Sequence, residues 1–243
     1  PLIIYGLVSN QSIGKLFEAG ILPGLTFGFL LCLYVIIRTW NLPDTLRPKA
    51  TLKERYNAVL GAVDVFLLPI IVLGSIYGGI FTPTEASAVA MVYAMVITAP
   101  NFHKQGVRNF IHVVARGCVT SAAILLVLAG AAVFGYAMTD SGIPQSLVAW
   151  ISANELSVLG FLIFVNVLLI CLGMFLEVIS ALLITLPIFL PLINILGINP
   201  IHFAIIMIIN MEIAAVTPPI GLNLFTLSAI GRVSISEVFR GTI

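Results

Sequence analysis

The stretch IAAVTPPIGLNLFTLS, residues 213–228, is an apolar run that two adjacent prolines and a glycine interrupt. Its length and hydrophobicity fit a membrane span, but Pro218 and Pro219 remove two consecutive backbone donors and Gly221 adds conformational freedom. A regular helix therefore cannot continue through the segment, and we expect it to break at bilayer depth. In hydrocarbon each unpaired backbone group costs roughly several kcal/mol unless protein, water or an ion satisfies it.

A helix that breaks at this depth indicates a binding site. Hydroxyl and amide oxygens lie beside the break, on Thr217, Asn223, Thr226 and Ser228. Neutral oxygens of this kind can bind a small cation or form hydrogen bonds to a solute. The alternative is a proline-kinked helix whose polar groups bond to neighbouring helices. The residues alone leave both interpretations open.

The composition is that of an integral membrane protein. Of 243 residues, 60% are hydrophobic and 9% are charged, with a mean hydropathy of +1.16, whereas soluble domains carry about 25% charged residues. The apolar runs are continuous rather than alternating, which favours helices over a barrel. A net charge of +1 gives no basic surface for nucleic acid. We predict an all-α, polytopic helical protein in the lipid bilayer.

Two ten-residue segments indicate an internal repeat. SIGKLFEAGI, residues 12–21, and SISEVFRGTI, residues 234–243, share Ser, Ile, Phe and Ile at matching positions. Residues 1–21 are then the end of a first repeat. Since the chain opens at Pro1 without an initiator methionine or a signal peptide, we expect a piece of a protein about twice as long.

The distribution of basic residues predicts the orientation of the spans. Residues 41–56, with Arg47 and Lys49, and residues 101–110, with Lys104, are basic and are placed in the cytoplasm, whereas residues 140–157 have no Lys or Arg and are placed outside. The remaining apolar segments are the predicted spans: residues 22–40, 59–80 with Asp64 near its start, 86–98 and 110–138. On this topology Arg232 lies inside and its repeat counterpart Asn10 outside, so the two repeats are inverted.

Residues 158–196 are apolar over nearly forty positions, and Gly173, Glu177 and Ser180 lie where a turn is expected. A hairpin that enters and leaves on one side would place Glu177 at membrane depth, inside protein rather than lipid. A carboxylate there costs on the order of 2.5 kcal/mol or more, so Glu177 would face a polar cavity or a partner. Two full spans joined near the interface are equally compatible with the sequence.

A second irregular segment, GGIFTPTEASAVA, covers residues 78–90. Thr82 before Pro83, with Glu85 three positions on, predicts a capping box at the start of a helix. The alternative is a functional role for its glycines and polar residues, which are Gly78, Gly79, Thr82, Pro83, Thr84 and Glu85.

Several of these motifs, in order, resemble one family. GGIFTPTEASAVA, FLEVISALLITLPIFLPL, GINPIHFAII and TPPIGLNLF are similar to the large membrane (permease) subunit of tripartite ATP-independent periplasmic (TRAP) transporters. The resemblance covers essentially the whole chain, and the family's first half, with its first hairpin and sodium site, is missing. LIIYGLVSNQS after Pro1 looks like the end of the first-repeat motif.

The resemblance implies an elevator-type transporter, in which hairpins and broken helices form a mobile transport domain carried by a scaffold. Residues 1–21 would end the first repeat of that domain, residues 22–157 would form scaffold and connecting helices, and residues 158–243 would form the second hairpin and broken helix. It also implies sodium as the coupling ion, a small membrane subunit, a periplasmic solute-binding protein, the bacterial inner membrane, and an acidic solute such as a C4-dicarboxylate or a sialic acid.

The resemblance to the family places the sodium candidates at the carbonyls of Gly173 and Met174 and at the hydroxyl of Thr217. Neutral oxygens can bind Na⁺ without a deep charged trap that would hinder its release. The further transport-domain candidates are Glu177, Ser180, Glu212, Pro218, Pro219, Gly221 and Asn223. Glu177 and Glu212 could instead bond within the domain.

Two other classes of function compete with a transporter. A channel would also use polar broken helices, but inverted repeats with a midplane site fit alternating access better. An intramembrane protease would need paired histidines or two converging carboxylates; the three histidines are isolated, and only Glu177 and Glu212 could converge. We do not predict an enzyme.

Overall fold

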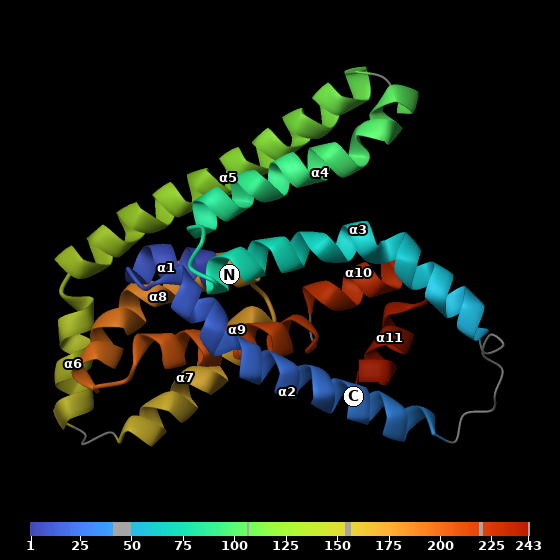
Figure 1. Ribbon diagram of the computed structural model, residues 1–243. Coiled ribbons are helices and arrows are strands. Elements are labelled where there is room, and N and C mark those ends of the chain that lie inside the picture. Colours follow the sequence, from blue (N-terminus) through green and yellow to red (C-terminus); the bar gives the residue numbers. More distant parts are fainter. Residues whose placement is uncertain (41–49, 106, 154–156, 219–220, 243) are drawn as a thin grey trace. The chain divides into compact units, whose positions relative to one another are not determined.

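The computed structural model describes residues 1–40, 50–105, 107–153, 157–218 and 221–242 (Figure 1). Arg47, Lys49 and Pro219 therefore lie outside the described residues. Within the described ranges the chain forms helices and no strand, which confirms the predicted all-α class. The helices are α1 (Leu2–Ser9), α2 (Ile13–Thr39), α3 (Leu52–Tyr77), α4 (Pro83–Gln105), α5 (Val107–Asp140), α6 (Ile143–Ala153), α7 (Val158–Gly173), α8 (Val178–Ile195), α9 (Pro200–Ala215), α10 (Leu222–Gly231) and α11 (Ile235–Thr242).

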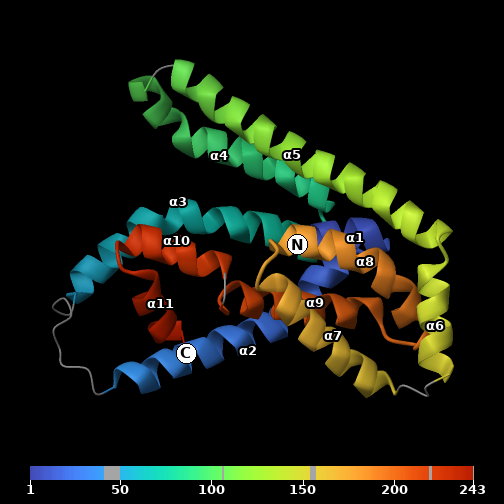
Figure 2. The ribbon, with the colours of Figure 1, turned by 180° about the vertical axis from the view of Figure 1, so that it is seen from behind.

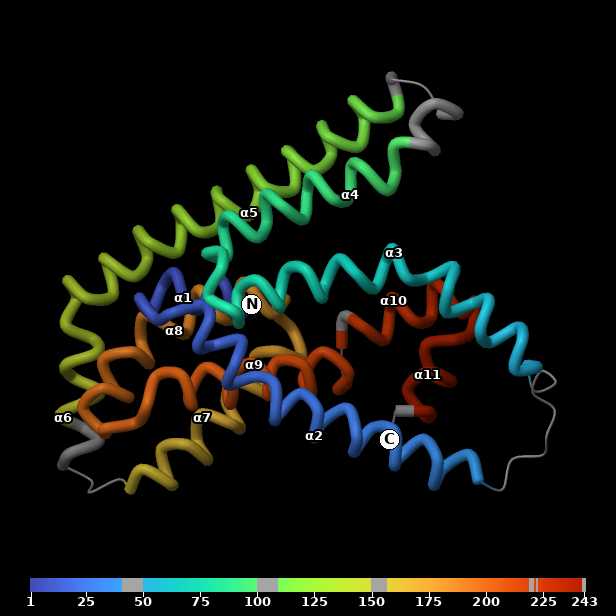
Figure 3. Tube along the Cα trace, viewed as in Figure 1, coloured from blue at the N-terminus to red at the C-terminus, as the bar shows by residue number. Residues whose placement is uncertain are grey.

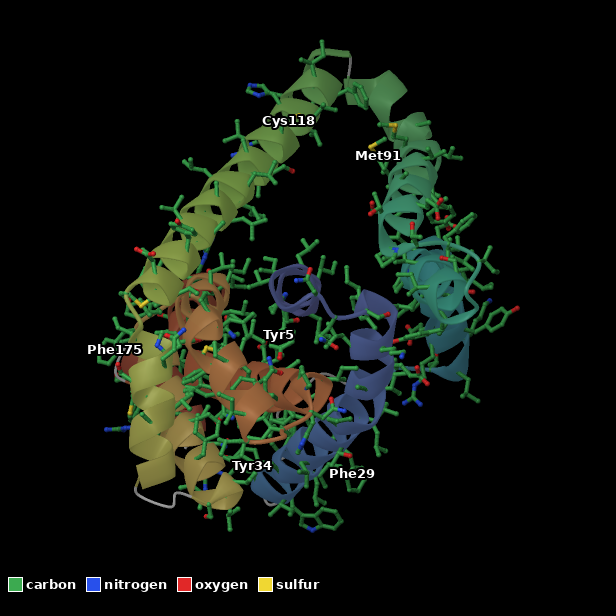
Figure 4. All side chains as sticks on the ribbon, turned by 90° about the vertical axis from the view of Figure 1, so that its left-hand side faces the viewer. Tyr5, Phe29, Tyr34, Met91, Cys118 and Phe175 are labelled. Atoms are coloured by element: carbon green, nitrogen blue, oxygen red, sulfur yellow. The ribbon has the colours of Figure 1, made fainter. Side chains whose placement is uncertain are left out.

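Four helices are long and apolar enough to cross a membrane: Ile13–Thr39, Leu52–Tyr77, Asn109–Asp140 and Val178–Ile195. In the first three, the most apolar stretch has no buried residue, so these helices expose apolar side chains along their length. Phe29 and Tyr34 on α2, which are 66% and 39% exposed, are examples (Figure 4). Such exposure of apolar side chains is what a bilayer stabilises and water does not.

Two helices extend beyond the spans predicted within them. The first span was predicted over residues 22–40, and α2 begins at Ile13 and continues through Pro23. A proline removes one backbone hydrogen bond, and the remaining bonds of a long apolar helix keep it helical. Helix α3, which contains most of the span predicted over residues 59–80, begins at Leu52 because Thr51 and Glu54 form a capping box there. Asp64 therefore lies near the middle of α3.

The chain divides into two compact units, residues 20–120 and residues 1–19 with 121–243. In the first unit α3 and α4 lie side by side, and the Tyr93 hydroxyl donates to the backbone carbonyl of Asp64 at 2.9 Å. In the second unit α7, α8 and α9 pack together with α1 (Figures 1 and 2). Each unit thus has its own helix contacts.

The core of the second unit is built from aromatic and aliphatic side chains of α7, α8 and α9. Phe189 contacts Phe161 and Phe203 edge to face, with ring centroids 6.4 and 5.7 Å apart. Tyr5 of α1 is fully buried against this core (Figure 4), and its hydroxyl donates to the Pro200 carbonyl at 2.6 Å. Tyr5 therefore ties the first residues of the chain to the start of α9.

The same turn occurs near the end of each of the two proposed repeats. Asn10 after α1 and Arg232 after α10 are the described non-glycine residues with positive φ, at 54° and 52°. In each case the serine two positions on, Ser12 or Ser234, accepts a hydrogen bond from the N–H three residues later, at 3.5 and 3.3 Å. A left-handed residue that ends a helix and a serine that caps the next one thus recur at aligned positions, in agreement with the predicted repeat.

Candidate functional site

The predicted interruption of the last apolar run is confirmed. Helix α9 ends at Ala215, and the N–H groups of Val216 and Thr217 close a tighter turn onto the carbonyls of Ile213 and Ala214, at 3.2 and 3.0 Å. Helix α10 begins at Leu222, directly after Gly221. We call residues 216–218 with Gly221 the break; Pro219 lies outside the described residues.

The predicted turn between α7 and α8 is also confirmed. Helix α7 ends at Gly173 and α8 begins at Val178, and residues 174–177 form what we call the tip. The N–H groups of Phe175 and Leu176 both donate to the Leu172 carbonyl, at 3.1 and 2.8 Å. Figure 3 shows the chain reversing direction at this turn.

The tip and the break touch each other. The Gly221 N–H donates to the Met174 carbonyl at 3.3 Å, a bond between residues 47 positions apart. Gly173, the residue before Met174, packs on Ala214 so closely that a Cβ on Gly173 would lie 2.6 Å from the Ala214 Cβ. The fold therefore brings together two helix interruptions that are separate in the sequence.

Glycine is required at the centre of this contact. Gly221 has a φ of +52°, and a Cβ there would lie 2.9 Å from both the Thr217 carbonyl oxygen and Leu224 Cδ1. The Thr217 carbonyl and the Met174 carbonyl thus both lie within reach of one glycine backbone. We call these two carbonyls, with the side chain of the same Thr217, the tip–break junction.

The Thr217 side chain keeps acceptor capacity. Its hydroxyl donates to the Ile213 carbonyl at 2.6 Å, which uses the proton and leaves oxygen lone pairs. Of the other candidates, Pro218 lies half-buried in the break, and Asn223 is exposed on the first turn of α10. Glu212 is exposed on α9, and in the described chain no hydrogen bond or ion pair joins it to the tip.

Glu177 bonds within its own domain, which is one of the alternatives that the sequence left open. Its side chain is exposed and caps α8, with one carboxylate oxygen accepting from the N–H groups of Ile179 and Ser180 at 3.1 and 3.2 Å. The Ser180 hydroxyl lies 3.5 Å from the same oxygen. A carboxylate beside the free N–H groups at a helix start is stabilised by them and by the helix dipole. Glu177 therefore bonds within its own helix.

The motif at residues 78–85 forms the predicted capping box. The Thr82 N–H and hydroxyl donate to one Glu85 carboxylate oxygen, both at 2.8 Å, and the Glu85 N–H donates back to the Thr82 hydroxyl at 3.4 Å. Pro83 is the first residue of α4, Gly78 ends α3, and Gly79 has a φ of +65°. Thr84 accepts the Ser87 hydroxyl on its carbonyl at 2.7 Å. The structural role is confirmed, and a functional one stays a prediction.

Two asparagines that the sequence analysis did not single out join α7 to α9. Asn210 is 5% exposed, and its amide nitrogen donates to Asn166 Oδ1 at 2.6 Å and to the Ile206 carbonyl at 2.8 Å. Asn166 donates to the Leu162 carbonyl at 2.6 Å. A lone amide within an otherwise apolar helix is the signal that could have identified them.

Comparisons with known proteins agree with this architecture. The family described as "Tripartite ATP-independent periplasmic transporter, DctM component" matches residues 1–243. The C4-dicarboxylate TRAP transporter large permease protein DctM of Pseudomonas aeruginosa is 37% identical over 100% of this chain and 57% of its own length. The sialic acid TRAP transporter large permease protein SiaM of Vibrio cholerae is 34% identical over 100% and 57%.

A third relative, the ectoine TRAP transporter large permease protein TeaC of Halomonas elongata, is 34% identical over 99% of this chain and 56% of its own length. The chain thus spans little more than half the length of these relatives. It belongs to the DctM-component family of tripartite ATP-independent periplasmic transporters and is a multi-pass protein of the bacterial inner membrane.

Proposed function

We propose that this protein takes part in sodium-coupled secondary active uptake of a small acidic organic solute across the inner membrane, and that the tip–break junction binds the coupling ion. The observation that carries the proposal is the hydrogen bond from the Gly221 N–H to the Met174 carbonyl. It brings two helix interruptions into contact, which is the arrangement in which secondary transporters bind ions.

Helix lengths support a junction at membrane depth. Helix α9 has 16 residues, about 24 Å, which is less than the roughly 30 Å of a hydrocarbon core. Helix α10 continues with exposed apolar side chains, Phe225, Leu227 and Ile230. If α9 and α10 together form one broken span, the break lies within the bilayer. The tip beside it then lies there too, which favours a re-entrant hairpin for α7 and α8 over two full spans.

The chemistry of the junction suits Na⁺. The Met174 carbonyl, the Thr217 carbonyl and the Thr217 hydroxyl are hard, neutral oxygen donors, and the Gly173 carbonyl is next along the chain. A site without a formal charge binds a monovalent cation weakly enough to release it on the far side. Gly221 would serve as the hinge of this site, because it occupies a left-handed conformation between two helices.

The names of relatives support the proposed solute class without fixing it. Two relatives are named for C4-dicarboxylates and for sialic acid, which are acids, and another is named for ectoine. We propose an acidic solute of the dicarboxylate or sialic acid class, delivered by a periplasmic solute-binding protein. A small membrane subunit would complete the transporter, and movement would be of the elevator type. We propose transport rather than catalysis as the role of the chain.

The test is uptake of labelled succinate and sialic acid into proteoliposomes that contain the full-length parent, its small subunit and its binding protein. We expect saturable uptake that requires an inward sodium gradient and the binding protein. Thr217→Ala should raise the sodium concentration for half-maximal uptake about tenfold, since it removes one oxygen ligand. Thr139→Ala is the matched control, because the Thr139 hydroxyl makes the same bond within its helix, to the Gly135 carbonyl at 2.9 Å.

Three outcomes would contradict the proposal. If the wild type takes up solute without sodium, sodium is not the coupling ion. Non-saturable flux at channel rates would favour a channel. If Thr217→Ala has the sodium dependence of the wild type, Thr217 does not bind sodium and serves only as a hydrogen-bond donor in a kinked helix. The family membership of the chain would not be affected.

A further inference from the structure

The amide pair Asn166–Asn210 lies in the apolar interface between α7 and α9. The donated bond of 2.6 Å from Asn210 Nδ2 to Asn166 Oδ1 connects residues 44 positions apart. Asn210 is 5% exposed, so this amide cannot be explained as a solvated surface group. An amide in such an interface loses its hydrogen bonds to water, and the bond to the partner amide replaces one of them.

The amide pair precedes the tip–break junction on both helices. Asn166 lies seven residues before Gly173 on α7, and Asn210 lies four residues before Ala214 on α9. Asn166 is opposite Asn210 and Gly173 is opposite Ala214, so α7 and α9 run in the same direction. Seven helical residues rise by roughly 10 Å and four by roughly 6 Å. The amide pair is therefore a polar contact between α7 and α9 that lies one to two helical turns before the junction.

We propose that Asn166 and Asn210 are a positioning pair, which sets the register of α7 against α9 and thereby holds the Met174 carbonyl beside the break. The inference rests on the proposed function, because the junction that it positions is the proposed sodium site. A slip of one residue along α9 would separate the two amides, and it would also move the Gly221 N–H by about 1.5 Å relative to the Met174 carbonyl.

The amides add a directional hydrogen bond to an interface that otherwise consists of non-directional apolar contacts. The surrounding contacts are between aliphatic side chains, including Val165, Leu169 and Met207, and such contacts tolerate more than one register. A single buried Asn is the best-attested device for selecting one register between helices. Hydrogen bonds between membrane helices change a folding equilibrium only about threefold on average. The pair is therefore expected to affect placement more than stability.

The test is amide hydrogen exchange on the full-length parent with its small subunit in lipid nanodiscs, comparing the wild type with Asn166→Leu, Asn210→Leu and the double variant. We expect the peptide that contains Gly221 to exchange about tenfold faster in each single variant, while the α8 amides keep their protection. The double variant should be no worse than either single variant, because one bond accounts for both effects.

Thr185→Val is the matched control. Thr185 is 4% exposed, and its hydroxyl bonds only within α8, to the Ala181 carbonyl at 2.8 Å. This variant removes a buried polar group without touching an interhelical bond, so exchange at Gly221 should stay at the wild-type rate. If it accelerates equally, or if α8 loses protection in the asparagine variants, the pair is a stability element and the proposal is wrong.

Uptake by the same variants separates this inference from the proposed function. We expect the sodium concentration for half-maximal uptake to rise about tenfold, with the maximal rate changed less than about twofold. If exchange at Gly221 becomes faster while the sodium dependence of uptake is unchanged, the asparagine pair positions the junction but the junction does not bind sodium. Unchanged exchange at Gly221 would overturn the positioning role whether or not the wild type is sodium-coupled. A single variant that fails to assemble leaves the other and the double variant to decide.

Discussion

The chain contains two Thr-Pro steps between helices, and they are resolved in different ways. At Thr82–Pro83 the polar groups close on themselves, since Glu85 accepts both Thr82 donors and returns its own N–H. At Thr217–Pro218 there is no acid three positions on, and the backbone of Gly221 bonds instead to the tip 47 residues earlier. A break that satisfies itself needs no partner, whereas a break that depends on a second element can respond to a ligand or to movement.

The largest effect on uptake and stability is expected when Gly221, at the second of these Thr-Pro steps, is substituted. Gly221→Ala places a Cβ 2.9 Å from the Thr217 carbonyl oxygen and adds the left-handed cost of roughly 1–2 kcal/mol. We expect uptake to be lost and the thermal unfolding temperature in detergent to fall. Gly79→Ala is the control, since Gly79 has a φ of +65° and nothing within 4 Å of its Cβ position. If Gly221→Ala and Gly79→Ala lose uptake and stability equally, strain in the left-handed backbone alone explains the loss, and the contact at the junction does not.

The next effect concerns the contact of Gly173 with Ala214. Gly173→Ala would place two Cβ atoms 2.6 Å apart, and overpacking of this kind costs about 1–3 kcal/mol. The tip should move off α9, with reduced uptake and a lower unfolding temperature. Gly74→Ala, in α3 with nothing within 4 Å, should instead stabilise its helix by about 0.5–1 kcal/mol. A neutral Gly173→Ala would show that the tip does not need this close approach.

Glu177 sharpens the comparison because it lies at the tip but resembles Glu85 in its role. Glu177→Ala removes the α8 cap and should destabilise the protein by about 1 kcal/mol, seen as a lower unfolding temperature. Glu177→Gln keeps an acceptor oxygen and should retain most of that stability. Neither variant should change the sodium concentration for half-maximal uptake. A shift in that concentration with Glu177→Gln would assign the carboxylate a part in ion binding.

The smallest effect is expected for single tyrosine hydroxyls. Tyr5→Phe removes the 2.6 Å bond from a fully buried side chain to the partly buried Pro200 carbonyl, which should cost about 0.5–1.5 kcal/mol. Tyr93→Phe removes a similar bond to the Asp64 carbonyl at an exposed site, where water replaces the donor. Unfolding temperatures of the two variants check the order. A larger loss for Tyr93→Phe would show that the α3–α4 pair depends on the Tyr93 hydroxyl.

The sequence by itself determined the membrane class, the helical fold, the interruption of the last apolar run beside Thr217 and Gly221, the turn after Gly173 and the capping box at Thr82. These features depend on groups a few residues apart: a proline lacks its own N–H, and a cap reaches three positions along the chain. The span predicted over residues 22–40 did not reveal that its helix already begins at Ile13, because a proline is a local signal and a long helix can continue through it.

Tertiary structure alone decided which of these local features meet. Met174 bonds to Gly221, Asn166 to Asn210 and Tyr5 to Pro200 across separations of 47, 44 and 195 residues. The sequence left open whether Glu177 faces a polar cavity or bonds within its domain, and in the structure it caps α8 through the N–H groups of Ile179 and Ser180. The first two pairings depend on α7 and α9 lying side by side and the third on α1 packing against α9, which no short segment of the chain encodes.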